Sequence, residues 1–259
     1  FEDLKSFRNS FNEVFAMAPH QIQLGFLKVL KGSEIYERAE EYGIVCQSEP
    51  PYEMLYTKWL SYEDVLELKR VEEMVELFYN SSQFCHTMSA LLTLFESPYD
   101  MFLALAEYYE KRGFPVNSPS RNHRYEIVLE FVKSLKVGER AEELFGELLT
   151  FDVYLREKAK SRPAFSRDIR SFTQKIILFY RQQEKGSDLL PDYVEKGYDG
   201  RQMMRMTHVD VFRYPVWDKE WLDGLRMDEI YPGQERFILF DYEKRNPLTY
   251  EAEFMLIEI

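Results

Sequence analysis

The chain has 259 residues, which is enough for one large domain or two small ones. Hydrophobic residues make up 45% of the sequence and charged residues 30%, the balance of a soluble globular protein and not of a disordered chain. The 45 acidic residues outnumber the 33 basic ones, and the formal net charge is −12. Because phosphate binding needs clustered positive charge, this balance argues against a surface that coats nucleic acid.

Targeting and metal-binding signals are few. No run of 18 apolar residues is present, so we expect no membrane span. The first residues, Phe-Glu-Asp-Leu-Lys, lack the basic and apolar regions of a secretion signal, and we expect a cytoplasmic protein. The two cysteines, Cys46 and Cys85, are too few for a disulfide framework. They are also too few for a cluster or zinc site that needs three or four cysteines from this chain.

The first 57 residues have an α/β pattern. Apolar residues at helical spacing predict a helix over residues 2–17, and the run QIQLGFLKVL over 21–30 predicts a buried strand. Ser33 can cap a helix over 34–42, and residues 44–46 are typical of a second strand. The order helix, strand, helix, strand predicts parallel β/α units.

From residue 60 onward the periodicity is almost entirely helical. Ser61 with Asp64 resembles a capping box, and Ser97-Pro98 is a typical helix start. Apolar stripes predict helices that begin at these two signals and further helices over 121–135, 139–158 and 168–183. Strands are expected over 203–214, 236–242 and 250–256, as an antiparallel meander. The predicted fold is therefore mainly α, with a short α/β segment at the N-terminus and a small antiparallel sheet at the C-terminus.

The expected strand over 21–30 poses a problem. It is apolar on both faces, so it needs neighbouring strands on both sides. Either the C-terminal strands supply them, or the missing strands lie upstream of Phe1. We favour the second alternative, because this sequence offers few candidates for such neighbours and the chain, which lacks an initiator methionine, has the character of a processed chain or a fragment.

Three segments carry a family resemblance. FNEVFAMAPHQIQLGFLKVLKGS (11–33), ERAEEYGIV (37–45) and PPYEMLYTKWLSYEDVLELKRVEEMVELFYN (50–80) together resemble the end of the barrel in cobalamin-binding-type radical SAM proteins of anaerobic bacteria. The match is dense over residues 1–80. Residues 81–259 are similar, through weaker motifs, to the helical C-terminal domain of unknown function that follows the barrel in this family of Fe–S oxidoreductases.

The resemblance implies a domain order. A cobalamin-binding domain comes first, then a β/α barrel, then the region present here. Residues 1–57 would be the end of the barrel, and residues 58–259 the helical C-terminal domain with its terminal β-meander. The upstream barrel and cobalamin-binding domains would be the partners of this chain. The cofactors of the parent protein would be S-adenosylmethionine, a [4Fe–4S] cluster and, in this type, cobalamin.

One essential motif of the family is absent. Its CxxxCxxC triad holds the cluster that cleaves S-adenosylmethionine, and the sequence contains no such motif. We therefore expect this chain to be catalytically inert by itself, whatever reaction its parent performs. The substrate and reaction of the parent are not readable from the sequence.

The resemblance implies a cofactor contact at one place, the late strand end followed by Gly-Ser. Residues near this end lie against the adenine of the cofactor in radical SAM barrels. Apolar side chains can stack on a flat heterocycle, and a glycine allows close approach of the backbone. The alternative is a strand, turn and helix with Ser33 as N-cap and no ligand. The residues expected at this contact are Leu27, Val29, Lys31, Gly32 and Ser33.

Two pairs of residues, each with a histidine, are candidates for binding a metal ion. Cys85 and His86 are adjacent, so on a helix they point about 100° apart and cannot easily share one ion. We expect a buried free thiol beside a surface histidine. His208 and Asp210 lie two residues apart on an expected strand and share one face. They would suit a metal pair or an oriented imidazole, or form an exposed cross-strand polar pair.

One stretch of the sequence is densely basic. It could bind an anion or a partner domain, but a solvated loop between helices is the default expectation. The stretch contains Arg156, Lys158, Lys160, Arg162, Arg167 and Arg170.

Two functional hypotheses remain. The first is an accessory C-terminal part of a radical SAM protein that covers the barrel and shapes substrate access. The second is a standalone helical binding or scaffold protein with no enzymatic parent. The first predicts self-association, or rearrangement, through the unpaired segment 21–30. The second predicts a monomer in which this segment is paired on both sides.

Overall fold

The computed structural model describes residues 2–114, 120–186 and 188–259. It is 48% helical and contains a two-stranded and a three-stranded antiparallel sheet among the described residues, which confirms the predicted fold class. The chain divides into two compact units. Unit 1 comprises residues 1–81 and 94–118, and unit 2 comprises residues 82–93 and 119–259. The expected domain boundary at residue 57 stays a prediction.

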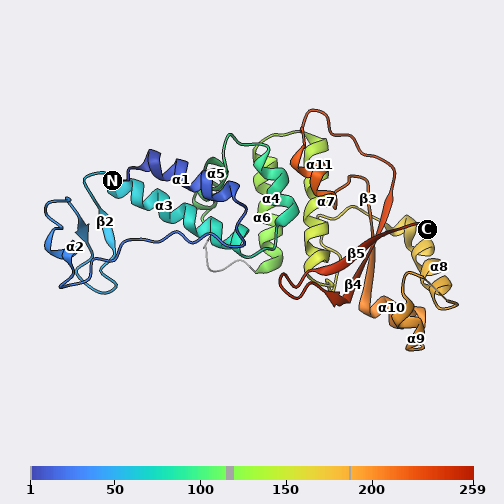
Figure 1. Ribbon diagram of the computed structural model, residues 1–259. Helices are drawn as coiled ribbons and strands as arrows, with labels where there is room; N and C mark the ends of the chain where they lie inside the picture. Colours follow the sequence, from blue (N-terminus) through green and yellow to red (C-terminus); the bar gives the residue numbers. More distant parts are fainter. Residues whose placement is uncertain (1, 115–119, 187) are drawn as a thin grey trace. The chain divides into compact units, whose positions relative to one another are not determined.

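Unit 1 is built on helices that begin where the sequence indicates. Ser61 caps α3 in a full capping box with Asp64, and Ser97 caps α5, which Gly113 ends in the left-handed conformation with φ 66°. Its elements are α1 (Leu4–Ala16), α2 (Glu34–Glu37), β1 (Val45–Cys46), β2 (Met54–Tyr56), α3 (Tyr62–Met74), the π-helical turn η1 (Val75–Asn80) and α5 (Pro98–Arg112) (Figure 1).

Aromatic rings join α1 to α5. The buried Phe11 ring packs edge-on against Tyr99 and Phe102, with centroids 5.6 and 6.0 Å apart. The Tyr99 hydroxyl donates to Glu67 of α3 at 2.9 Å, and Arg8 of α1 donates to the same carboxylate oxygen at 2.7 Å. The Glu67 carboxylate therefore links α1, α3 and α5, the helices that precede and follow residues 21–60 in the chain.

The predicted strand over residues 21–30 is wrong. Only Lys28 forms a bridge, antiparallel to Glu53, although hydrogen bonds join Leu27 to Met54 and Val29 to Tyr52. The physical reason lies in the partner segment, because Tyr52 has a φ of 56° and cannot continue a strand. The run 21–30 is also not buried on both faces, since Leu27 is 36% exposed and Leu30 is 56% exposed.

The predicted parallel arrangement of the first 57 residues is also wrong. β1 pairs with β2, a strand the sequence pattern did not indicate, and the pair is antiparallel, with Val45 opposite Tyr56. Only residues 47–53 join the two strands, whereas a parallel connection needs a dozen residues or more. The expected helix over 34–42 shortens to one turn, α2, which Ser33 caps as predicted.

Unit 2 has a three-stranded sheet in the order β3-β4-β5, with β4 at its centre and both pairs antiparallel. This confirms the expected meander. The elements of the unit are α4 (Cys85–Leu92), α6 (Arg121–Ser134), α7 (Glu139–Arg156), η2 (Arg170–Phe172), α8 (Thr173–Gln183), α9 (Pro191–Glu195), α10 (Gly200–Met206), β3 (Thr207–Phe212), α11 (Lys219–Asp223), β4 (Arg236–Arg245) and β5 (Ala252–Ile257).

Helices cover both faces of this sheet, with α7 on one side and α8 to α10 on the other (Figure 1). On the α7 face, Phe151 contacts one ring from each strand, namely Phe212, Phe240 and Phe254, at centroid distances of 5.2–5.7 Å. On the opposite face, Phe179 and Tyr180 of α8 pack against alternate residues of the strands. The alternation of side chains along each strand therefore supplies two separate cores.

The predicted strand over 203–214 is correct only in its second half. Residues Gly200–Met206 form α10, because Asp199 and Gln202 make a capping box that starts a helix. The chain becomes extended only at Thr207. Among the described helices, none combines the length and the apolar character needed to cross a bilayer.

Candidate functional site

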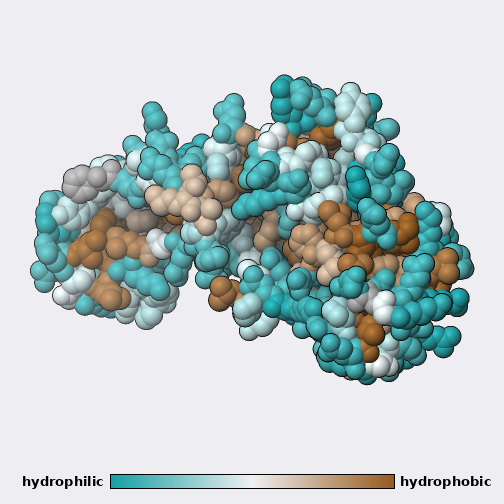
Figure 2. Space-filling model, turned by 45° about the vertical axis from the view of Figure 1, so that its right-hand side comes forward, coloured by the Kyte–Doolittle hydropathy of each residue, from teal (hydrophilic) through white to brown (hydrophobic). Residues whose placement is uncertain are grey.

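Unit 1 contains an apolar pocket with a volume of about 470 Å³. Figure 2 shows hydrophobic side chains gathered on this part of the chain. The pocket lies between the beginning of α1, the segment 24–27, α3, and the residues around α2, β1 and β2. Its lining is Glu2, Phe7, Leu24, Gly25, Phe26, Leu27, Ile35, Tyr42, Ile44, Met54, Thr57, Trp59, Leu60 and Leu68.

Two polar side chains near the pocket, those of Thr57 and Lys58, already interact with neighbouring residues. The Thr57 hydroxyl accepts hydrogen bonds from the backbone N–H groups of Trp59 and Leu60, at 3.1 Å each. The Lys58 ammonium lies 4.5 Å from the centre of the Trp59 ring and 5.8 Å from that of Tyr42. Because the remaining lining is largely aliphatic and aromatic, the pocket is suited to bury apolar side chains or a flat ring and not to perform acid–base chemistry.

The structure brings one of the five predicted cofactor residues to this pocket, namely Leu27. Val29 is buried elsewhere, with 1% exposure. The Lys31 ammonium lies 5.1 Å from the centre of the Tyr52 ring, and Gly32 occupies a turn with a φ of 82°. The Ser33 hydroxyl accepts from Tyr36 N–H and donates to the Leu30 carbonyl at 2.7 Å.

Ser33 is thus the N-cap of α2, as the alternative interpretation requires. The other three residues, Val29, Lys31 and Gly32, do not line the pocket, and neither does Ser33. Contact of any of the five with adenine stays a prediction. Sequence reasoning missed the aromatic members Phe26, Tyr42 and Trp59. The sequence shows that aromatic residues are abundant in this region of short, irregular elements. Abundance alone does not indicate which of the rings come together in the fold.

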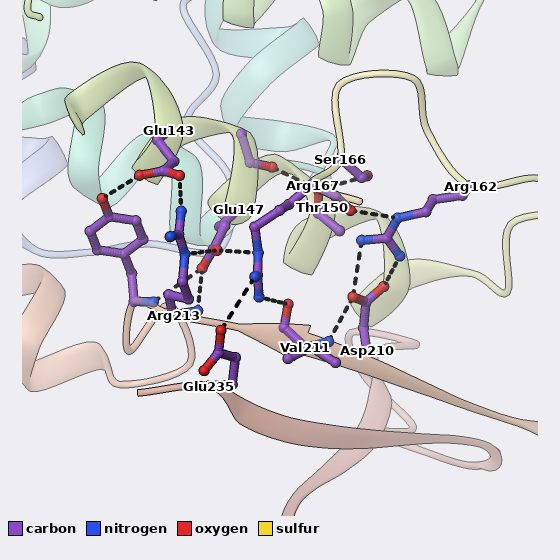
Figure 3. A network of polar contacts seen from close by, with 12 residues as sticks. Glu143, Glu147, Thr150, Arg162, Ser166, Arg167, Asp210, Val211, Arg213 and Glu235 are labelled. Atoms are coloured by element: carbon purple, nitrogen blue, oxygen red, sulfur yellow. Dashed lines mark hydrogen bonds and ion pairs between the residues drawn. The ribbon is translucent and has the colours of Figure 1, made fainter. Parts of the chain in front are cut away.

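Unit 2 contains a second candidate, a network of buried charges that joins the loop 157–169 to α7 and β3 (Figure 3). Arg162 pairs with Asp210 through both guanidinium Nη atoms. Arg167 lies 3.3 Å from Glu147 and also donates to the Val211 carbonyl. The expectation of a solvated basic loop is therefore wrong for these two arginines, because internal carboxylates neutralise them.

His208 and Asp210 lie on one face of β3, as predicted. His208 Nε2 is 3.1 Å from Asp210 Oδ2, and the imidazole stacks on the Tyr154 ring with centroids 3.8 Å apart. The side chain of Asp210 is completely buried, so the alternative of an exposed polar pair is wrong. Burial alone would raise the pKa of Asp210, but hydrogen bonds from His208 and Arg162 hold it below its ordinary value.

Glu147 occupies the other end of the network. Its Oε2 accepts the backbone N–H groups of Arg213 and Tyr214, at 2.8 and 3.1 Å. Burial raises the pKa of Glu147 above its ordinary value, although these hydrogen bonds and Arg167 oppose the shift. Arg213 also pairs with Glu143. Each carboxylate of the network thus has internal partners, and the geometry indicates a structural role rather than a reacting centre.

The expectation of a surface histidine at position 86 is wrong. Cys85 is exposed as a residue, while the His86 side chain is only 18% exposed. His86 Nδ1 lies 3.0 Å from Oδ1 of Asp152, whose side chain is buried. Burial of the sulfur, with Asp152 and Glu251 nearby, raises the pKa of the Cys85 thiol to about 12. The thiol is therefore protonated at neutral pH and is not an activated nucleophile.

No group of three or more histidine, cysteine, aspartate or glutamate side chains is arranged to hold a metal ion within residues 2–114, 120–186 and 188–259.

Comparison with known proteins identifies a family. The model of a family described as "Protein of unknown function (DUF4080)" matches residues 40–240, which covers the first sheet, the helices from α3 to α11 and part of the second sheet, and leaves out α1 and α2. No curated protein matches the chain.

Proposed function

The chain belongs to the DUF4080 family of proteins of unknown function, and on this premise we propose that it is the accessory C-terminal part of a radical SAM protein. In this proposal, unit 1 docks on the barrel through its apolar pocket and shapes substrate access. The chain supplies no catalytic group and is inert alone. The resemblance of residues 1–80 to the end of such a barrel supports the proposal, and the pocket supplies a surface for the contact.

The observation that supports the proposal most strongly is the solvent exposure of apolar side chains in residues 24–30. These residues are strongly apolar, yet they lie open beside the pocket, with Leu27 36% and Leu30 56% exposed. Exposed apolar patches of this kind mark interaction surfaces in soluble proteins. Their backbone is paired on one side only, through the bridge from Lys28 to Glu53. A neighbouring strand from a barrel would satisfy the other side and cover Leu27 and Leu30.

The exposed apolar surface extends beyond residues 24–30. Val45 of β1 and Tyr56 of β2 are 39% and 42% exposed, so apolar area continues beyond the pocket. At about 25 cal/mol per Å² of buried apolar area, covering even a few such side chains contributes several kcal/mol to docking. A domain held in this way excludes water from the barrel mouth and narrows the path to it.

The test compares this chain with the product of its complete reading frame. We expect that frame to encode a CxxxCxxC motif upstream. Backbone amides of residues 24–30 should exchange with solvent deuterium in the chain alone and be protected in the longer protein. The variant Leu27→Asp should lower that protection and weaken association between separately produced upstream and C-terminal parts. Leu248→Asp is the matched control, because Leu248 is 83% exposed on unit 2 and outside the pocket.

Two results would overturn the proposal. One is a reading frame with no cysteine triad. The other is exchange over residues 24–30 that is the same in both proteins, with no effect of Leu27→Asp on association. Either result would favour the standalone binding or scaffold protein, whose pocket would then serve a different apolar occupant.

A further inference from the structure

An oriented histidine lines a cavity in unit 2, away from the buried network. Asp152 Oδ2 accepts hydrogen bonds from the backbone N–H and the hydroxyl of Thr87, at 2.9 and 2.7 Å. Its Oδ1 accepts the backbone N–H of His86 at 3.1 Å and lies 3.0 Å from His86 Nδ1. A carboxylate can only accept, so His86 Nδ1 carries a proton here. In the neutral ring, this tautomer presents the lone pair of Nε2 as an acceptor.

The ring is held in place by packing as well. Its centroid lies 4.7 Å from that of Phe151, in an edge-to-face arrangement. His86 Nε2 makes no hydrogen bond within the described part of the chain. The cavity beside it has a volume of about 820 Å³ and lies along the ends of β4 and β5. Its lining is His86, Leu155, Trp217, Glu243, Lys244, Arg245, Asn246, Glu251, Ala252, Glu253 and Phe254.

The cations of this cavity already have partners. The Lys244 ammonium pairs with Asp192 at 2.9 Å. Arg245 donates to three backbone carbonyls, those of Tyr242, Arg156 and Tyr250, at distances of 2.6–3.2 Å. Neither residue is therefore available as a dedicated anion-binding group.

The carboxylates of the cavity are less engaged. Glu251 accepts one hydrogen bond, from the Thr249 hydroxyl at 2.9 Å. Glu243 and Glu253 are exposed and make no side-chain hydrogen bond or ion pair among the described residues. Three glutamates thus face the Arg245 guanidinium, which donates only to backbone carbonyls and has no carboxylate partner among the described residues, and Asp152 is buried behind His86. The local field favours a cation, and Trp217 adds an aromatic ring that a cation can approach.

We propose that this cavity binds a small organic cation that carries an aliphatic amine. Glu243 and Glu253 supply the opposing charge, and His86 Nε2 accepts a hydrogen bond from the ammonium. Asp152 is a positioning residue, because it fixes the tautomer and the orientation of the ring. This binding site is independent of the docking surface on unit 1, and neither proposal requires the other.

The experiment is a calorimetric titration of the chain with 1,5-diaminopentane, with 1,5-pentanediol as the uncharged molecule of the same length. We expect saturable one-to-one binding of the diamine, with a Kd of about 1 mM or tighter, and none of the diol. Glu253→Gln and His86→Gln should each weaken the diamine about tenfold, or roughly 1.4 kcal/mol. Glu258→Gln, an exposed glutamate outside the cavity, should leave binding unchanged.

Folding of the variants is checked by circular dichroism, and Glu253→Gln is the decisive variant because its side chain is exposed and unpaired. Equal binding of diamine and diol, absence of saturable diamine binding, or equal effects of Glu253→Gln and Glu258→Gln would overturn the proposal. If Glu253→Gln weakens binding and His86→Gln does not, the role of the histidine is wrong.

Discussion

Arg162 and Asp210 form a two-pronged ion pair although 48 residues separate them in the sequence. Nη1 lies 2.5 Å from Oδ2, and Nη2 lies 3.1 Å from Oδ1. The pair anchors an irregular loop on a fully buried carboxylate of β3. His208 adds a third contact to the same carboxylate. Arg162 and Arg167 of the basic stretch 156–170 are therefore part of the interior architecture of unit 2.

We expect Asp210→Asn to lower the free energy of unfolding by about 3–5 kcal/mol at pH 7, because it leaves a partly buried guanidinium without its counter-charge. The folded-state pKa of Asp210 lies below its ordinary value. Its contribution to stability is therefore complete above the unfolded-state pKa of about 3.9 and is lost as the pH falls through the lower folded-state value. The difference between wild type and variant should be constant from pH 7 to 5 and shrink below pH 4, as measured by urea unfolding.

The control for this prediction is Asp168→Asn. Asp168 pairs with Arg170 at 2.5 Å, but both side chains are exposed. Removing an exposed pair should cost no more than about 1 kcal/mol. Equal destabilisation by the two variants would contradict the structural role of Asp210.

The thiol of Cys85 should alkylate slowly. Its raised pKa, about 12, leaves a very small thiolate fraction at pH 8, and the thiolate is the reacting form. We expect the rate with iodoacetamide to be far below that of an unfolded peptide of the same sequence and to keep rising at pH 10. Peptide mass spectrometry measures both rates. Glu251→Gln should accelerate the reaction, because it removes a nearby negative charge that raises this pKa; a slower reaction would count against it.

Phe151 is the ring most central to the α7 face of the sheet. It is fully buried and contacts one ring on each of β3, β4 and β5. Phe151→Ala should cost about 3–5 kcal/mol of stability, and Phe151→Leu less, since it leaves a smaller cavity. Chemical unfolding followed by fluorescence gives both values. The exposed Leu248→Ala should stay within about 0.5 kcal/mol of wild type.

Residues 21–30 should promote self-association of the chain. The backbone of Ile22 makes two hydrogen bonds with the Asn80 side chain. Leu27 and Leu30, in contrast, have exposed side chains in a segment whose backbone is paired on one side only. Sedimentation at several concentrations should show association that Leu30→Lys reduces and Leu248→Lys does not. A monomer at all concentrations, with strong amide protection over 21–30, would refute this prediction.

The chain by itself should bind no iron–sulfur cluster. A [4Fe–4S] cluster of this type needs three closely spaced cysteines, and the sequence has two, at positions 46 and 85. Anaerobic reconstitution followed by iron and sulfide assays measures the content. Stoichiometric, stable iron in the purified chain would refute the prediction, and a Cys46→Ser variant would show whether a cysteine holds it.

The sequence was most informative where a structure depends on local interactions. The caps at Ser33, Ser61 and Ser97 lie where the pattern predicted them, because a cap is made by residues three or four apart. The alternation of 250–256 likewise predicted β5. His208 and Asp210 were placed on one face of a strand by their spacing alone. In each case the deciding contacts lie within a few residues of the chain.

Tertiary structure decided everything that depends on a distant partner. Segment 21–30 has the composition of a strand, but its pairing depends on the backbone of residues 52–54, where the turn at Tyr52 leaves room for one bridge. Asp210 is buried because Arg162 arrives from a loop, and His86 is oriented because Asp152 of α7 reaches the start of α4. Short-range periodicity determines which residues form helices and strands, whereas the partner of a buried charge depends on how those elements pack.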